Sequence, residues 1–169
     1  MTTKKAKPAA KGSRGRSNAG EDRKIAFGNE WSRVIDATEA DAAQAASQLG
    51  VAFPEDLSAL LIECGGGRPK KNYYRSRKNN IEVSVGYVLP VRDGRVKGVA
   101  SECTSYRKTH QLPLTLIPFA YDTGNANLMC LDLSSGEVVY WLHDDPSDRV
   151  RKVAPTLKEF LSGLEPSPF

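Results

Sequence analysis

The apolar residues of segment 54–67 recur at the spacing of one helical face. They fall at positions i, i+3, i+4 and i+7: Leu57, Leu60, Leu61 and Cys64. Pro54 suits the first turn of a helix, and the glycines at 65–67 can end it, because glycine enters the left-handed conformation without a Cβ penalty. Each leucine would contribute about 1.5–3 kcal/mol if fully buried. The pattern therefore predicts a helix that packs its leucine face into the core.

Capping residues predict two helices before this one. Thr38 and Asp41 resemble a capping pair for an alanine-rich helix that ends at Leu49 and Gly50. Asn29 is a candidate cap for a short helix nearer the N-terminus. The apolar residues of that short helix would be Trp31, Val34 and Ile35. The chain is thus expected to begin with helices.

Further helices are predicted in the second half of the chain. Segment 99–110 is ambiguous and is assigned to a short helix. Thr156 and Glu159 have the spacing of a capping box behind Pro155. The residues that follow place four large apolar side chains on one face: Leu157, Phe160, Leu161 and Leu164. A last amphipathic helix is therefore expected to close the fold.

Alternating apolar and polar residues predict strands in the middle of the chain. At 81–87 the apolar positions are Ile81, Val83, Val85 and Tyr87. Three apolar segments follow, at 114–121, 128–133 and 137–143, separated only by short turn sequences. Short turns between neighbouring strands imply antiparallel pairing. The predicted fold class is α+β, with N-terminal helices, a central, mainly antiparallel twisted sheet and a C-terminal helix packed on it.

The first 24 residues differ in composition from the rest of the 169-residue chain. They hold eight Lys and Arg against Glu21 and Asp22, with no aromatic or large aliphatic residue after Met1. Such a segment cannot offset the entropy lost on ordering, so residues 1–24 are predicted to be a basic disordered arm and 25–169 one domain. The arm could contact nucleic acid through counterion release, or could be only a solvated leader.

Composition also bears on location and redox state. No apolar run approaches the roughly 20 residues that span a bilayer, and no apolar signal-peptide core follows the basic N-terminus. A cytoplasmic protein without membrane contact is therefore expected. The three cysteines, Cys64, Cys103 and Cys130, cannot all pair within the chain and match no CxxC or zinc-finger spacing. Buried free thiols are expected.

Charge is unevenly placed inside the predicted domain. Residues 68–110 carry eleven Lys and Arg against three acids, whereas residues 122–148 carry six acids and no Lys or Arg. Residues 25–67 are acidic as well, with seven acids against Arg33. Separate fields of opposite sign could steer and orient a charged partner. The alternative is that the blocks interleave once the chain is folded.

Three patterns that resemble chemical sites fail on spacing or context. The GGGRPKK segment at 65–71 lacks GxxxxGK[ST] spacing and follows a predicted helix, whereas a P-loop follows a strand. Asp122 and the two asparagines after it miss the 1, 3, 5 ligand spacing of a calcium loop. His143 has neither a nucleophile elbow nor an evident third partner beside Cys130. No catalytic residue, metal site or cofactor is predicted, so a non-enzymatic role is expected.

Two longer motifs resemble a known family. They are LGVAFPEDLSALLIECGGGRP at 49–69 and LIPFAYDTGNANLMCLDLSSGEVVYWLHDD at 116–145, with the helix TLKEFLSGL behind them at 156–164. In this order and separation they resemble the Smi/Knr group of the SUKH superfamily over about residues 29–164. The basic arm and the strongly basic GGGRPKK segment depart from the family pattern.

The resemblance implies an α+β fold and, in bacteria, an immunity protein that binds and silences a cognate toxin, often a nuclease. Relatives in fungi resemble regulatory scaffolds. The alternative to toxin neutralisation is thus a regulatory adaptor, with nucleic-acid contact through the basic arm. The oligomeric state is left open.

The partner-binding surface is expected on loops, because loops on a rigid scaffold usually carry recognition. The predicted residues are those of the acidic hairpins, Asp122, Asn125, Asp144, Asp145 and Asp148; those of the basic loop, Tyr73, Tyr74 and Arg75; and Trp141 at a strand end. Acidic residues would mask the cationic surface that a nuclease presents to nucleic acid. Such steering would raise the association rate and weaken with salt.

Overall fold

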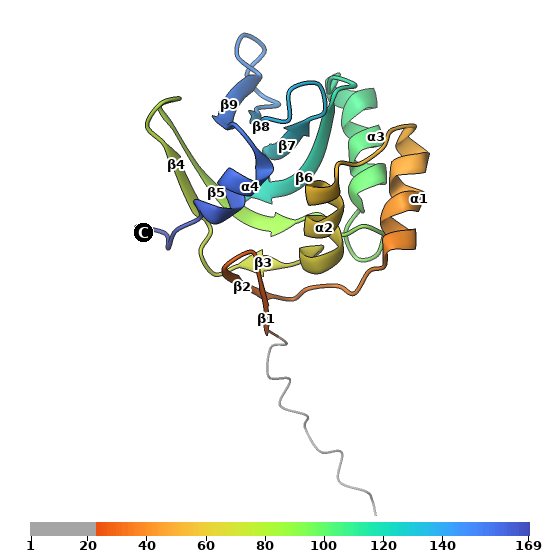
Figure 1. Ribbon diagram of the computed structural model, residues 1–169. Helices are drawn as coiled ribbons and strands as arrows, with labels where there is room; N and C mark the ends of the chain where they lie inside the picture. The colour runs from red at the N-terminus through yellow and green to blue at the C-terminus, as the bar shows by residue number, and fades with distance from the viewer. Residues whose placement is uncertain (1–22) are drawn as a thin grey trace, which may run out of the picture.

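The computed structural model describes residues 23–169, and its largest element is a six-stranded antiparallel sheet (Figure 1). The strands lie side by side in chain order: β4 (Tyr73–Ser76), β5 (Ile81–Val88), β6 (Leu116–Asp122), β7 (Leu128–Asp132), β8 (Val138–Trp141) and β9 (Val150–Ala154). The strand predicted at 81–87 is confirmed as β5, and the meander after residue 114 as β6–β8. Sequence periodicity misses β4 and β9, because both are short and carry basic residues.

A second, three-stranded antiparallel sheet is formed by β1 (Arg23–Ala26), β2 (Asn29–Ser32) and β3 (Arg68–Pro69). The helix predicted from Asn29 is therefore wrong. Phe27 and Gly28 join β1 to β2 with φ values of 52° and 66°, the two positive angles that a type I′ hairpin turn needs. Asn29 does not cap a helix but ties the hairpin to Lys71, donating from Nδ2 to its carbonyl at 2.7 Å and accepting from its N–H at 3.0 Å.

Trp31 anchors this small sheet to the core. It is 1% exposed, as expected of a core residue, and its Nε1 donates to the carbonyl of Ala26 at 2.9 Å. Arg23 and Lys24, which composition assigned to the basic arm, lie in β1. The remainder of the predicted arm, residues 1–22, lies outside the described residues.

The first two helices, α1 (Glu39–Leu49) and α2 (Glu55–Cys64), agree closely with the sequence. The α1 capping box is present, with Thr38 and Asp41 exchanging side-chain to backbone hydrogen bonds of 3.2 and 2.9 Å. Gly50 ends α1 in the left-handed conformation. All four residues of the predicted apolar face of α2 are 0% exposed: Leu57, Leu60, Leu61 and Cys64. After α2 the left-handed position is taken by Gly66, with φ of 77°.

The other two helices, α3 (Val99–His110) and α4 (Leu157–Ser162), also confirm the sequence-based assignment. Thr156 caps α4 by accepting from the N–H of Glu159 at 3.1 Å. α1 packs against α2 and α3, α3 against β6, and α4 against α2 and β9. Figure 1 shows α1, α2 and α3 gathered beside the strands, with α4 in front of the sheet. No helix within residues 23–169 is both long and apolar enough to cross a membrane.

The large sheet curls, so that its first and last strands approach each other. Tyr73 in β4 exchanges two backbone hydrogen bonds with Glu165, of 3.0 and 2.8 Å, and Asn79 donates to the carbonyl of Val153 at 3.3 Å. The register between β5 and β6 shifts around Gly86, where a bulge bends the sheet. The C-terminal segment therefore closes part of the edge of β4.

Gly86 is a position where only glycine fits. A Cβ built there collides with the backbone carbonyl of Asp122 on β6. We expect Gly86→Ala to lower the free energy of unfolding in urea by about 1–3 kcal/mol, the cost of overpacking. At Gly94 a Cβ meets nothing within 4 Å, so Gly94→Ala should change stability by less than about 0.5 kcal/mol. Equal effects of the two substitutions would contradict this account.

Candidate partner-binding site

Three of the residues predicted to bind a partner are buried. Tyr73 and Asp122 are 8% exposed and Trp141 is 2% exposed, whereas the sequence placed them on accessible loops or strand ends. Each belongs to a strand of the curled sheet, and the rest of the fold covers its side chain. These three residues therefore belong to the core beneath the surface and do not themselves form an exposed contact area.

Asp122 organises the turn between β6 and β7. Its carboxylate accepts hydrogen bonds from the hydroxyl of Tyr140 at 2.6 Å, the amide of Asn127 at 3.2 Å and the backbone N–H of Ala126 at 3.0 Å. Burial, and then the hydrogen bond to Asp122, raises the pKa of Tyr140 to about 12. A carboxylate that is satisfied in this way is a structural element of the turn.

The aromatic residues of the predicted site make packing contacts. The ring of Tyr74 lies against that of Phe160 in α4, with centroids 5.1 Å apart. The guanidinium of Arg149 lies over the ring of Trp141 at 5.7 Å. Arg75 remains exposed, and its Nε pairs with Glu82 at 3.0 Å. Of the three predicted basic-loop residues, Arg75 is therefore the one with an exposed side chain.

Two other predicted residues lie on exposed loops at the end of the sheet. Asn125 occupies the β6–β7 turn in a left-handed conformation with φ of 53°. The Asp144 side chain is 87% exposed, with Oδ1 placed 2.9 Å from Nε2 of His143. His143 in turn contacts Asn127 through Nδ1 at 3.3 Å, so the two loops are linked. Asn125 and Asp144 are therefore exposed, and their contact with a partner stays a prediction.

The β8–β9 loop is held by its own polar groups. Asp145 Oδ1 accepts from Ser147 N and Oγ and from Asp148 N, at 3.1, 2.8 and 3.1 Å. The Ser147 hydrogen bond is the largest cause of the lowered pKa of Asp145. Arg151 on β9 pairs with Asp145 at 3.6 Å and with Asp148 at 2.8 Å. Part of the loop's negative charge is thus neutralised within the fold.

The charge blocks of the sequence interleave in part. Lys70 pairs with Glu30 at 3.2 Å and Arg92 with Asp41 at 3.7 Å, so basic residues of the middle block lie against acids of the first block. The pKa of Glu30 is lowered, chiefly by the Lys70 hydrogen bond. For these pairs the second alternative, in which the blocks interleave, is the one that the fold adopts.

The chain's thiols lie inside the core. Cys64, Cys103 and Cys130 are free and 0% exposed, as the sequence predicts. Burial raises the pKa of Cys64 to about 12 and that of Cys103 to about 11, and it raises the pKa of Cys130 as well. Because the thiolate is the reactive form, these residues are not placed as nucleophiles. Within residues 23–169 no group of three or more His, Cys, Asp or Glu is placed to hold a metal ion.

The raised thiol pKa values predict that the fold weakens in alkali. An unfolded thiol ionises near pH 8.5, whereas the folded chain keeps Cys103 and Cys64 protonated to about pH 11 and 12. Between these pH values the native state binds more protons than the unfolded state. The free energy of unfolding therefore has its full value below pH about 8.5 and falls as the pH rises toward 11. Urea denaturation from pH about 8 to 10.5 should show this decrease. A free energy of unfolding that stayed constant would contradict it.

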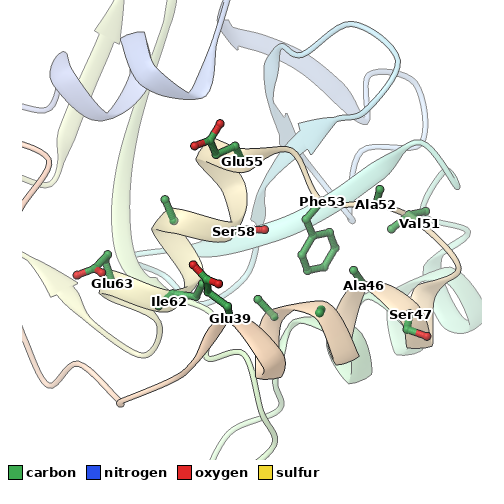
Figure 2. A pocket seen from close by; sticks show the side chains of 13 residues that line it. Glu39, Ala46, Ser47, Val51, Ala52, Phe53, Glu55, Ser58, Ile62 and Glu63 are labelled. Carbon is green, nitrogen blue, oxygen red and sulfur yellow. The ribbon is translucent and has the colours of Figure 1, made fainter.

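A groove with a volume of about 700 Å³ lies between α1 and α2 (Figure 2). Its walls are the small residues of both helices, among them Ala43, Ala46 and Ala59. The linker between the helices forms its third side, and Figure 2 shows the ring of Phe53 pointing into the space. Ile62, half-buried on α2, completes the apolar lining.

The rim of this groove is acidic. Glu39 and Glu63 lie at the end where the helices converge, and Glu55 lies at the start of α2 (Figure 2). Lys, Arg and His are absent from the thirteen described residues that line the groove. Just outside it, the ammonium group of Lys24 on β1 pairs with Glu63. The groove therefore combines an apolar floor with an acidic rim.

Sequence reasoning did not find the groove. α1 contains five alanines, and alanine favours a helix without supplying bulk to fill the space beside it. The alanine content of α1 is the one feature of the sequence that could have indicated a groove. The path of the 51–54 linker and the divergence of the two helices decide that the space stays open, and neither follows from helical periodicity.

Comparison with known families places the two motifs in one domain. Residues 36–163 match the model of the SMI1 / KNR4 family (SUKH-1), close to the 29–164 range over which the sequence resembles that family. This match covers well over half of the chain and includes the motifs at 49–69 and 116–145. A comparison with curated proteins gives no match. The chain therefore belongs to the SMI1 / KNR4 family, SUKH-1.

Proposed function

We propose that this chain is an immunity protein that binds a cognate nuclease toxin in the cytoplasm and blocks it stoichiometrically, without catalysis. Membership of the SUKH-1 family over residues 36–163 is the observation that carries the proposal, since this family is associated with immunity.

The exposed loops at the end of the sheet support binding of a cationic surface. Asn125 and Asp144 are accessible, and Asp145 and Asp148 hold the neighbouring loop in one conformation. A loop that is already ordered loses little entropy when it binds. Exposed acids steer a basic nuclease toward the complex, and this contribution weakens as salt rises. Arg75, on β4, is the accessible basic residue proposed to contact an acidic patch of the toxin.

Co-expression tests this function directly. Cells that express the toxin candidate from the neighbouring reading frame should grow only when this chain is present, and the two proteins should elute together at a fixed ratio. Exchanging Asp144 for lysine should slow association, most clearly at low salt. If the chain protects against none of the neighbouring toxin candidates and forms no complex with them, the proposal fails.

The basic N-terminal segment favours a second candidate function, a regulatory adaptor that contacts nucleic acid. Residues 1–22 hold six Lys and Arg against Glu21 and Asp22. Removal of residues 1–22 separates the two candidates. Toxin neutralisation should survive the deletion, whereas retention on nucleic acid should be lost. Retention that does not change with salt would count against an electrostatic contact.

A further inference from the structure

We propose that the groove between α1 and α2 is a docking site for a basic amphipathic helix of the partner protein. The identification of that partner as the toxin rests on the proposed function. The site itself is inferred from the shape, lining and charge of the groove. It lies apart from the loop residues that the sequence predicted.

The groove has the shape that a helix needs. Two helices form its walls, and the alanines on those walls let a third backbone approach closely (Figure 2). Packed helices lie about 8–10 Å apart, with smaller side chains at the contact allowing the shorter distance. Phe53 and Ile62 offer apolar surface to side chains spaced i, i+3, i+4 and i+7 along the ligand. About 700 Å³ is within the usual size of a binding cleft.

The charge of the rim selects a basic ligand. Glu39, Glu55 and Glu63 border the apolar floor without a basic residue among the lining side chains. Lys24 pairs with Glu63 from outside the groove, which shows that a carboxylate of this rim accepts an ammonium group and leaves Glu39 and Glu55 as the main source of the rim's charge. A ligand helix with an apolar face and flanking lysines or arginines would meet both features. An acidic helix would be repelled.

Other occupants fit the groove less well. Residues 1–22 of this chain carry the right charge, but no aromatic or large aliphatic residue follows Met1, so they cannot cover Phe53 and Ile62. A second copy of the same face would bring the acidic rims together. A basic amphipathic helix of a partner would cover the apolar floor and pair with the acidic rim.

Direct binding of a model helix tests the site without the toxin. The probe is a fluorescein-labelled peptide of about 16 residues, long enough for about 24 Å of helix, with leucines on one face and lysines on the other. Its scrambled isomer is the control ligand. Fluorescence anisotropy with the full chain should show binding of the probe at least about tenfold tighter than that of the scrambled isomer, and weaker binding at high salt.

Two alanines of α1 provide matched variants. Ala43 is exposed and lines the groove, whereas Ala40 is exposed on the same helix but does not line it. Ala43→Trp fills the groove and should weaken peptide binding about tenfold or more, and Ala40→Trp should leave it unchanged. Thermal unfolding of both variants verifies that they fold.

Each remaining outcome decides the question. If folded Ala43→Trp binds the peptide as well as the unsubstituted chain does, or if the scrambled peptide binds equally, the docking site is disproved. If the peptide binds only after residues 1–22 are removed, the chain's own arm occupies the groove and the proposal is overturned. In co-expression, protection by Ala43→Trp equal to that of the unsubstituted chain would disprove docking of the toxin in the groove and would leave the immunity function unaffected. Failure of the unsubstituted chain to protect would disprove the immunity function alone.

Discussion

Trp141→Ala is expected to lower the free energy of unfolding by about 3–5 kcal/mol, the usual cost of removing a buried aromatic side chain. Trp141 is 2% exposed at the end of β8, where it pairs with Leu128 of β7 and Val150 of β9. Its ring also supports the guanidinium of Arg149. Removal of the indole leaves a cavity between three strands, and a domain of this size has only about 5–15 kcal/mol of stability.

Trp141→Phe is the matched control for this prediction. The indole nitrogen makes no hydrogen bond within residues 23–169, so phenylalanine gives up volume but no polar contact. Urea denaturation should place Trp141→Phe between the unsubstituted chain and Trp141→Ala. Partner binding per folded molecule should be unchanged in Trp141→Phe. A large loss of affinity in a fully folded Trp141→Phe variant would mean that Trp141 contacts the partner directly, as the sequence suggested.

Asp122→Ala is expected to have an effect of similar size, about 3–6 kcal/mol, because two hydrogen bonds to a buried carboxylate are worth about 1.5–3 kcal/mol each. The substitution leaves the Tyr140 hydroxyl and the Ala126 N–H without their acceptor. It also releases Asn127, which joins this turn to the β8–β9 loop through His143. Loss of order in both loops should accompany the loss of stability.

Asp144→Ala is the matched control for Asp122→Ala, because it removes an aspartate that is exposed instead of buried. It removes the same type of side chain from the same end of the sheet, but this side chain is 87% exposed. Its effect on urea denaturation should stay within about 0.5 kcal/mol. Under the proposed function it should instead slow association with the toxin. If Asp144→Ala destabilised the chain as much as Asp122→Ala, the distinction between a structural and an accessible aspartate would be wrong.

Local elements were predictable where a short pattern is sufficient to form them. The capping box at Thr38 and Asp41, the leucine face of α2 and the alternation in β5 each lie within about two turns or one strand. The segment at 29–35 shows the limit of this reasoning. Asn29 is common both at helix caps and beside tight turns, and its contact with Lys71, 42 residues away, decided for a strand.

The site residues were predicted from residue type, but in the structure some of them are buried and others are exposed. Asp122 and Asp144 are both acids next to turns, yet one is 8% exposed and the other has a side chain 87% exposed. Tyr73 and Arg75 stand two residues apart in β4, but Tyr73 is 8% exposed whereas the Arg75 side chain is 55% exposed. Which loop residues remain on the surface depends on the curl of the sheet, and that depends on contacts between distant strands.

The sequence by itself determined the α+β class, the helices, the meander and the family, because caps, periodicity and motifs are carried by neighbouring residues. Only the tertiary structure decided the β1–β3 sheet, the burial of Asp122 and Trp141, and the open groove between α1 and α2. Each of these depends on how elements far apart in the chain meet. Small alanine side chains permit a groove, but the packing of whole helices determines whether it forms.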